Sequence, residues 1–453
     1  MLEQGEQGKE TAPAFAKGSK DDFYMFSYTS GTTGDSKGVM LTHDNILSQA
    51  ACAMRRTNLE RGDCYISYLP YPHSYEQILT ASTLMCRGRV GYYQGDPLKI
   101  VEDCALLQPA FFPSVPRLYN RIYGKIMDGV GQATGCKKWL VNKAINSKRE
   151  ALAANGAVTS GCWDGLVFKK MAKLLGGKVK LMTTGSAPID KTVLDFLKIC
   201  FSCPIVEGYG LTETATGGAT TALTDKVTGH VGGPSEAVKI RLKDLPEMEY
   251  LSTDKPYPRG EICLKGPCVF KGYYKRQDKT DEAFDADDWF MTGDVGLIYP
   301  NGSVKIIDRS KNIFKLAQGE YLAPEKLENI FVLSPYVAQS MVYGDSLKSC
   351  AVAIVVVDEP KAKAFQDAHG KSDLASVYED PDFYKEVMDD ILRLAAENNL
   401  TGLEKPKKLY LTGDPFSIEN DMLTPTFKLK RNIAKKAYQA QLDAMYEALE
   451  PSK

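Results

Sequence analysis

Short apolar runs alternate with amphipathic stretches through the first half of the chain. The apolar runs predict strands at residues 23–28, 64–70, 178–185 and 203–210. The amphipathic stretches predict helices that follow Thr42, Tyr75 and Leu98, extend over 137–153, and begin after the N-cap residue Asp190. Alternation of strands and helices is typical of parallel sheets covered by helices, so we expect an α/β architecture here.

The pattern changes after about Gly229, where strands follow one another with little helix between them. KIRL (239–242) and GEICLKG (260–266) are predicted strands. Asn301-Gly302 separates two further strand-like runs, which is a strong hairpin signal. We therefore expect a β-rich subdomain at the end of a large N-terminal domain.

A smaller α+β unit follows Arg309. Its predicted elements are a helix from Pro324, strands at 336–343 and 350–357, helices at 361–368 and 384–398, a strand at KKLYLTG (407–413) and a terminal helix from Arg431. The sequence thus divides into a polar, flexible tail (1–22), a domain over 23–309 and a mobile C-terminal domain over 310–453, with the boundary at 308–311.

Composition narrows the function classes. The 453 residues carry 56 Lys and Arg against 57 Asp and Glu, so no charge excess points to nucleic acid. The longest apolar run, 351–357, is far shorter than the ~20 residues of a membrane span, and the polar N-terminus does not resemble a signal peptide. Eleven cysteines include one CxxC, Cys200 and Cys203, but there is no second pair, so we expect core thiols and no zinc site.

Four segments carry candidate chemistry. Residues 28–40 (YTSGTTGDSKGVM) end a strand with a Gly- and hydroxyl-rich loop that can wrap phosphates, with Lys37 supplying charge, although the Walker A spacing is absent. Residues 207–213 (EGYGLTE) put an aromatic ring and a carboxylate beside two glycines, but not the dinucleotide fingerprint. Residues 289–294 (WFMTGD) end on Asp294, and residues 423–428 (LTPTFK) on Lys428. Taken singly, Asp294 is better explained as a turn residue, and residues 423–428 as the solvated basic start of the terminal helix.

Together and in this order, the four segments resemble the motifs of the acyl-adenylate-forming superfamily, and most closely those of eukaryotic long-chain fatty acyl-CoA synthetases. The likeness extends from Tyr24 to the terminal helix. It is carried by YTSGTTGDSKGVMLTH (28–43), YGLTET (209–214), WFMTGDVG (289–296), KIIDRSKNIFKLAQGEYLAPEKLEN (305–329) and MLTPTFKLKR (422–431).

The resemblance implies a set of residue roles. The ATP phosphates would be held by Thr29, Ser30, Gly31, Thr32, Thr33, Gly34 and Lys37, and the adenine framed by Gly185, Ser186, Ala187, Pro188, Gly208, Tyr209 and Gly210. Asp294 and Arg309 would hold the ribose, Glu213 with Thr29 would bind Mg²⁺, and Thr212 would face the α-phosphate. Lys428 would activate the carboxylate and His73 would lie near the acyl pocket. The hinge residue would be Lys311, with Lys315 near the phosphates and Gln318, Gly319, Glu320 and Tyr321 along a thiol tunnel.

The function implied is ATP- and Mg²⁺-dependent ligation of a long-chain fatty acid to coenzyme A through an acyl-adenylate. The alternatives are adenylation of a different carboxylic acid and a non-catalytic nucleotide-binding remnant. The resemblance also implies the cytoplasmic side of an organelle such as the endoplasmic reticulum, with peripheral membrane contact. The phosphate loop begins at Tyr28, so we expect the large segment that family members carry ahead of it, including any membrane anchor, to be missing from this chain. The sequence does not indicate an oligomeric state.

Overall fold

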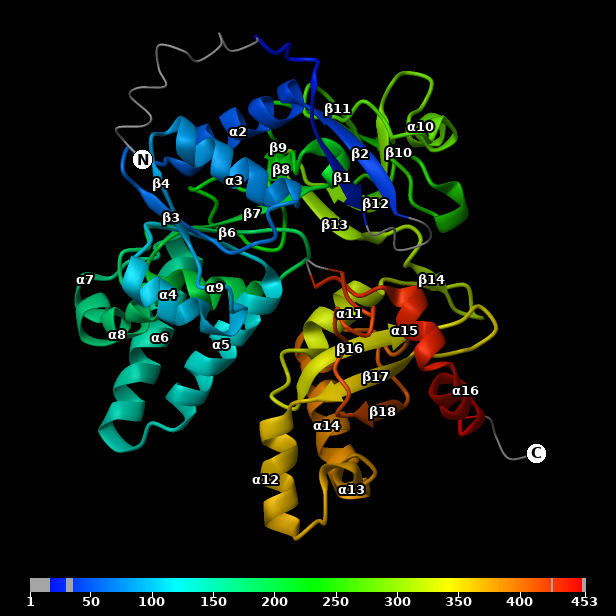
Figure 1. The fold of residues 1–453 in the computed structure, drawn as a ribbon. Helices are drawn as coiled ribbons and strands as arrows, with labels where there is room; N and C mark the ends of the chain where they lie inside the picture. Colours follow the sequence, from blue (N-terminus) through cyan, green and yellow to red (C-terminus); the bar gives the residue numbers. More distant parts are fainter. Residues whose placement is uncertain (1–16, 30–35, 425–426, 450–453) are drawn as a thin grey trace.

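The computed structural model describes residues 17–29, 36–424 and 427–449. Figure 1 shows a large N-terminal body, coloured blue to green, and a smaller C-terminal body, coloured yellow to red. The two meet near the point where the chain leaves β13 (Val304–Arg309) for β14 (Phe314–Lys315). The boundary at 308–311 stays a prediction.

A seven-stranded sheet forms the centre of the N-terminal body. Its order is β4 (Arg89–Tyr92), β3 (Cys64–Ser67), β5 (Phe111–Ser114), β6 (Leu181–Thr184), β7 (Ile205–Gly210), β8 (Gly218–Thr220) and β9 (Gly233–Pro234). The pairs from β4 to β7 are parallel, as the strand–helix alternation predicts, and β8 and β9 add antiparallel edges.

Helices cover both faces of this sheet because successive strand residues point to opposite sides. Phe112 packs in the larger cluster under α4 (Ile100–Leu107), α5 (Pro116–Gly131), α6 (Gly135–Asn155) and α9 (Lys191–Phe201). Its neighbour Phe111 packs on the opposite side with Leu79 of α3 (Ser74–Met85). The short helices α7 (Gly161–Trp163) and α8 (Lys169–Ala172) complete the layer between α6 and α9. Asp190 caps α9 as predicted, its side chain accepting the Thr192 N–H at 2.7 Å.

The second part of the N-terminal body is β-rich, as expected. It holds a four-stranded antiparallel sheet of β10 (Lys239–Lys243), β11 (Arg259–Lys265), β12 (Phe290–Ile298) and β13, with α10 (Gln277–Ala283) beside it. The Asn301-Gly302 turn joins β12 to β13, which confirms the hairpin prediction. The antiparallel pair β1 (Phe23–Thr29) and β2 (Lys37–Thr42) packs on this sheet through Val39 and Leu41, together with Ile46 of α2 (His43–Thr57).

The C-terminal body is built around a three-stranded sheet of β16 (Val337–Tyr343), β17 (Val352–Val357) and β18 (Leu409–Thr412). Alternate residues of β17 enter two separate clusters, and all six are buried. One cluster lies under α11 (Pro324–Phe331), α12 (Glu359–His369), α13 (Leu374–Tyr378) and α14 (Pro381–Glu397), and the other under α15 (Arg431–Ala437) and α16 (Gln439–Glu447). The small hairpin β14–β15 (Tyr321–Leu322) precedes α11.

The structure differs from the sequence prediction in several elements. The prediction of a single terminal helix is wrong, because the chain leaves helical geometry at Tyr438. The Tyr438 ring packs on Tyr410 and Phe416. Helix α5 and the β14–β15 hairpin were not predicted. Among the described residues, no helix is both long enough and apolar enough to cross a bilayer.

Candidate functional site: a cleft between the two bodies

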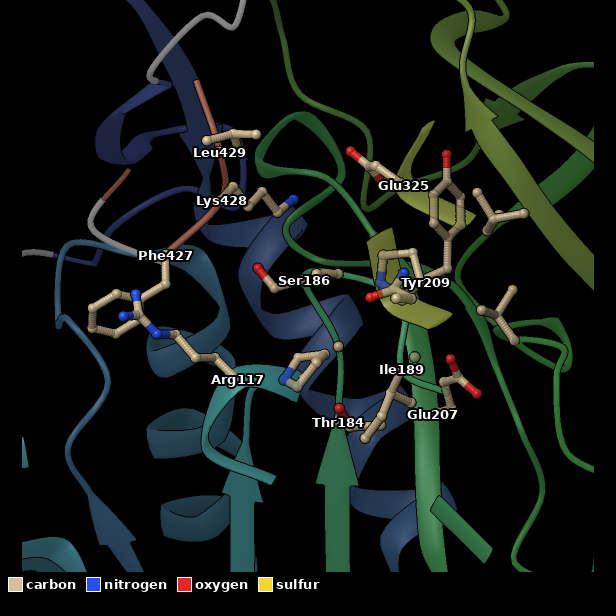
Figure 2. A pocket seen from close by; sticks show the side chains of 18 of the residues that line it. Arg117, Thr184, Ser186, Ile189, Glu207, Tyr209, Glu325, Phe427, Lys428 and Leu429 are labelled. Atoms are coloured by element: carbon tan, nitrogen blue, oxygen red, sulfur yellow. The ribbon is translucent and has the colours of Figure 1, made fainter. Parts of the chain in front are cut away.

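A cleft of about 3,000 Å³ lies between the N- and C-terminal bodies. Its floor is the carboxyl end of β6 and β7, where ligands bind in α/β sheets. The C-terminal body contributes the segment that carries Lys428, seen at the upper left of Figure 2. Pockets for one small ligand are about 300–1,000 Å³, so this cleft has room for more than one reactant.

Asp294 and Arg309 face each other across the β12–β13 hairpin, because they are partners in its register. The Arg309 guanidinium lies 3.4 Å from Asp294, and the Tyr209 hydroxyl donates to the other carboxylate oxygen at 2.8 Å. Asp294 is only 5% exposed, and this burial raises its pKa against the opposing effects of Arg309 and Tyr209. The three side chains form one polar cluster, drawn from two strands of one sheet and one of another.

The backbone of residues 185–188 lies against that of residues 208–210. A Cβ on Gly185 would lie 3.1 Å from the Gly208 carbonyl oxygen, and one on Gly210 only 2.0 Å from that of Thr216. Ser186 holds the left-handed φ of 76°, which non-glycine residues adopt rarely. Together these residues and Tyr209 make a tight wall on which a flat ring can lie (Figure 2).

Lys428 reaches into the same region. Burial and the nearby Arg309 lower its pKa to about 8, while Glu325, Asp294 and Glu213 act in the opposite direction. Its loop is pinned at the base, where the Lys428 N–H donates to Thr424 Oγ1 at 3.0 Å and the Thr424 N–H donates to the Lys428 carbonyl at 2.8 Å. Below pH 8 the ammonium is therefore charged in a partly buried, mixed-charge site.

Glu213 lies in a one-turn helix after β7 and accepts the Tyr273 hydroxyl at 2.9 Å. The Lys37 ammonium sits 4.5 Å from the centre of the same ring. Thr29 and Lys37 are register partners that close the β1–β2 hairpin, and Ser30, Gly31, Thr32, Thr33 and Gly34 lie outside the described residues. Tyr273 thus links the Lys37 end of the phosphate-loop motif to Glu213 at one edge of the cleft, where Thr212 also lines the wall.

His73 also lines the cleft and caps α3, its Nδ1 accepting the Tyr75 N–H at 3.1 Å. Because Nδ1 is an acceptor, the ring proton of neutral His73 resides on Nε2. Burial, with a smaller effect of Lys428, lowers the His73 pKa to about 4. His73 therefore offers a hydrogen-bond donor and no charge at neutral pH.

Some residues named from the sequence lie away from this cluster. Lys311 is exposed and borders the cleft, whereas Lys315, Gly319, Glu320 and Tyr321 do not line it. Lys315 lies over the Tyr321 ring, whose hydroxyl donates to the Glu247 carbonyl, and Gln318 donates to Ser349. This arrangement holds the β14–β15 hairpin on the outside of the molecule.

Sequence reasoning missed several cleft residues. Arg117 stacks on Phe427, with the guanidinium carbon 4.9 Å from the ring centre (Figure 2). Glu207 is buried at the floor, and this burial raises its pKa to about 8. Arg117 sits on α5, which was not predicted, and Glu207 was noted only as the start of a motif.

The two cysteines of the CxxC segment lie in the core. Cys200 and Cys203 are free, and burial raises both of their pKa values to about 12, which fits core thiols.

Among the described side chains, no group of three His, Cys, Asp or Glu residues could form a closed metal site. Mg²⁺ bound to a nucleotide uses one or two carboxylates together with phosphate oxygens, and the single carboxylate of Glu213 fits that requirement.

Comparison with known proteins agrees with this geometry. The sequence profile of the AMP-binding enzymes matches residues 2–274. The chain is 45% identical to the peroxisomal long chain acyl-CoA synthetase 6 of Arabidopsis thaliana, covering 98% of this chain and 63% of that protein. It is 41% identical to long-chain-fatty-acid–CoA ligase 5 of Rattus norvegicus, covering 98% and 65%. The chain therefore spans a little under two thirds of these relatives.

Solved structures show the same fold. The A domain of carboxylic acid reductase from Segniliparus rugosus, in complex with AMP and a co-purified carboxylic acid, superposes with a TM-score of 0.77 at 28% identity, covering 97% of this chain and 63% of that one. ATP-bound MatB from Rhodopseudomonas palustris superposes with a TM-score of 0.65 at 25% identity, covering 96% and 72%. These matches confirm the α/β architecture expected from the sequence.

Proposed function

This chain belongs to the family of AMP-binding enzymes, and from that premise we propose that it ligates a long-chain fatty acid to coenzyme A at the expense of ATP. The observation that carries the proposal is the convergence of Lys428, the Asp294–Arg309 pair and Glu213 in one cleft. The sequence similarity to long-chain acyl-CoA synthetases supports the choice of acid.

In the proposed first step a carboxylate oxygen attacks the α-phosphorus of ATP, the bond to the bridging oxygen breaks, and pyrophosphate leaves. Negative charge accumulates around the α-phosphate, and the Lys428 ammonium is placed to offset it. Asp294 would accept the ribose hydroxyls, with Arg309 and Tyr209 fixing its orientation through the contacts described above. Residues 185–188 and Tyr209 would enclose the adenine.

Glu213, with Thr29, would hold Mg²⁺, which supplies charge neutralisation for the phosphates when bound. Glu213 now accepts the Tyr273 hydroxyl, so that bond would loosen or rearrange as the ion enters. Lys37 and the loop after Thr29 would hold the outer phosphates. His73, as a neutral Nε2–H donor, would direct a hydrogen bond toward the bound carboxylate.

In the second step the thiol sulfur attacks the acyl carbon, AMP leaves, and the thiol proton is released. The transition state of this step does not build up negative charge around phosphorus as the first step does. Lys428 is therefore not required. Residues 315–321 lie outside the cleft here and would have to approach for the thiol to enter. A rotation about Lys311 would exchange them with Lys428, a gating motion of the kind that controls many enzymes.

Replacement of Lys428 tests the proposal. Lys428→Ala should slow acid-dependent ATP–pyrophosphate exchange by ~10²–10³-fold, the usual loss for one transition-state electrostatic partner. Thioester formation from a supplied acyl-adenylate should change by less than about threefold, on the same argument. Lys430→Ala is the matched control, since Lys430 pairs with Asp421. Equal losses in both half-reactions would contradict the role of Lys428.

The same assay separates the competing functions. Exchange supported best by an aromatic or medium-chain acid would replace the long-chain assignment while keeping adenylation. ATP binding without exchange for any acid would favour a nucleotide-binding protein without turnover.

We also propose peripheral attachment to an organelle membrane, because the acid substrate partitions into lipid. Two relatives carry the word peroxisomal in their names. Fractionation of cells expressing the tagged chain would test this, and recovery only in the high-speed supernatant would contradict it.

A further inference from the structure

We propose that Arg117 is a positioning residue, which clamps the Lys428 loop of the C-terminal body onto helix α5 of the N-terminal body. The inference rests on the proposed function for its kinetic part and on geometry alone for its conformational part. It assigns a role to a contact that spans the two bodies of the molecule. Figure 2 shows the Arg117 side chain extending to the Phe427 ring, which its guanidinium overlaps in this view.

The first argument is the contact itself. The guanidinium carbon of Arg117 lies 4.9 Å from the centre of the Phe427 ring, within the ~6 Å range of cation–π attraction. No carboxylate in the described part of the chain forms an ion pair with Arg117. The ring of Phe427 is therefore the described partner of this cation, and the planar guanidinium suits stacking on an aromatic face.

The second argument is the backbone of the loop. Phe427 has φ of 62°, the left-handed region that bulky residues rarely occupy, and its N–H donates to the Thr424 carbonyl at 2.8 Å. A residue held there needs compensating contacts from its surroundings. Lys428 follows directly, so the backbone conformation at Phe427 sets the direction in which the Lys428 side chain leaves the loop.

The third argument is the arrangement of α5. Arg117, Arg121 and Lys125 recur every four residues and share one face of the helix along the cleft. Of these three side chains, Arg117, nearest the N-terminus, lies over a described ring of the C-terminal body. Arg121 is also exposed and lies one turn away, so it provides a control on the same helix face.

Because Lys428 acts in adenylation, loss of the clamp should affect that half-reaction alone. Arg117→Ala and Phe427→Ala should each slow ATP–pyrophosphate exchange by roughly 3- to 30-fold, the range that such a contact supports. The double variant should be slower than either single by less than about twofold, because both remove the same interaction. Arg121→Ala should stay within about twofold of the parent, and Arg117→Lys should keep part of the rate that Arg117→Met loses.

The alternative is that Arg117 binds a substrate phosphate directly. In that case Arg117→Ala would raise the KM for ATP, Phe427→Ala would not, and the two losses would multiply in the double variant. That pattern would overturn the clamp. A reduction in kcat with an unchanged KM for ATP in both single variants is the expected result.

A second measurement does not depend on turnover. Amide hydrogen exchange at Lys428 reports opening of its bond to Thr424 Oγ1. We expect about 3- to 30-fold faster exchange at this amide in Arg117→Ala and Phe427→Ala, and parental exchange in Arg121→Ala. Faster exchange in a chain that never releases pyrophosphate would support the clamp and contradict the proposed function. Parental exchange in both clamp variants would overturn the clamp.

Discussion

At the scale of single residues, the charge state of Lys428 sets the pH range of the proposed reaction. Burial and Arg309 lower its pKa to about 8, so the ammonium form is present below pH 8 and is lost as the pH rises through that value. We expect the adenylation rate to fall above about pH 8, approaching tenfold per pH unit. The measurement is acid-dependent ATP–pyrophosphate exchange between pH 6 and 10.

Two features sharpen this test. The His73 pKa of about 4 means that His73 should contribute no acid limb between pH 5 and 8. Lys428→Arg, where it retains activity, should lose the alkaline limb, because a guanidinium stays charged throughout this range. A flat profile to pH 10 in the parent would contradict the assignment.

Glu213 permits a prediction about the metal ion. Glu213→Gln keeps the size of the side chain but removes its charge, so the Mg²⁺ concentration for half-maximal exchange should rise by about tenfold or more. Tyr273→Phe removes the hydroxyl that donates to Glu213 and leaves the carboxylate in place. That variant should need no more Mg²⁺ than the parent. Superimposable Mg²⁺ titrations for Glu213→Gln and the parent would exclude Glu213 as a ligand.

The sequence predicted some site residues better than others. Asp294 and Arg309 lie just outside the two strand-like runs of one predicted hairpin, so their pairing follows from the Asn301-Gly302 turn. Arg117 and Phe427 are 310 positions apart, and only tertiary packing brings them together. The pattern of residues in a single sequence does not predict contacts between side chains on such distant elements.

At the scale of elements, a buried ion pair joins α15 to α11. Arg431 donates to both Glu328 oxygens, at 2.8 and 2.5 Å, and Glu328 also accepts the Val342 N–H at 2.7 Å. Both side chains are at most 16% exposed. Removing one partner leaves a buried charge, so Arg431→Met should lower the free energy of unfolding of the C-terminal body by about 3–5 kcal/mol.

The double variant Arg431→Met with Glu328→Gln should cost less than either change alone, because it leaves no unpaired charge. Lys385→Met breaks the exposed pair with Asp389 on α14 and should stay within about 1 kcal/mol of the parent. Amide hydrogen exchange of β16–β18 under native conditions measures the free energy of unfolding of the parent and of each variant. A double variant less stable than both singles would contradict this account of the pair.

The pattern of elements was predictable where local signals agreed. Helix α9 has an Asp cap and a broad apolar face, and both its start and its type were predicted. Helix α5 places Tyr119, Ile122, Ile126 and Val130 on its buried face, a helical spacing that was present in the sequence. Glycines at 124, 129 and 131 weaken its helical propensity, so the helix depends on tertiary packing for its stability.

At the scale of the whole molecule, the two bodies should differ in resistance to proteolysis. Lys311 and Lys315 are exposed in the connection, so trypsin should cut there first. The C-terminal fragment contains both clusters that enclose β17 and should persist. In the N-terminal body, Phe23, Phe26 and Tyr28 of β1 are 44–66% exposed, and this exposed aromatic face should favour early opening and digestion.

Timed digestion followed by mass spectrometry gives the order of cleavage. Lys311→Gln combined with Lys315→Gln should delay the first cut without changing the order of later ones. Equal persistence of both bodies, together with a single cooperative thermal transition, would contradict this prediction.

The position of Lys428 in the chain also bears on how the protein is synthesised. The groups of the N-terminal body that we propose to face the nucleotide are complete once Arg309 has been translated, 119 positions before Lys428. At ~5–20 residues per second, a nascent chain would pass about 6–24 seconds with those groups made and the lysine still to come. Ribosome-bound chains, and products of premature stop codons beyond Arg309, would hold nucleotide without forming an adenylate. On the proposed function, late synthesis of Lys428 would keep unfinished polypeptides from producing a reactive anhydride.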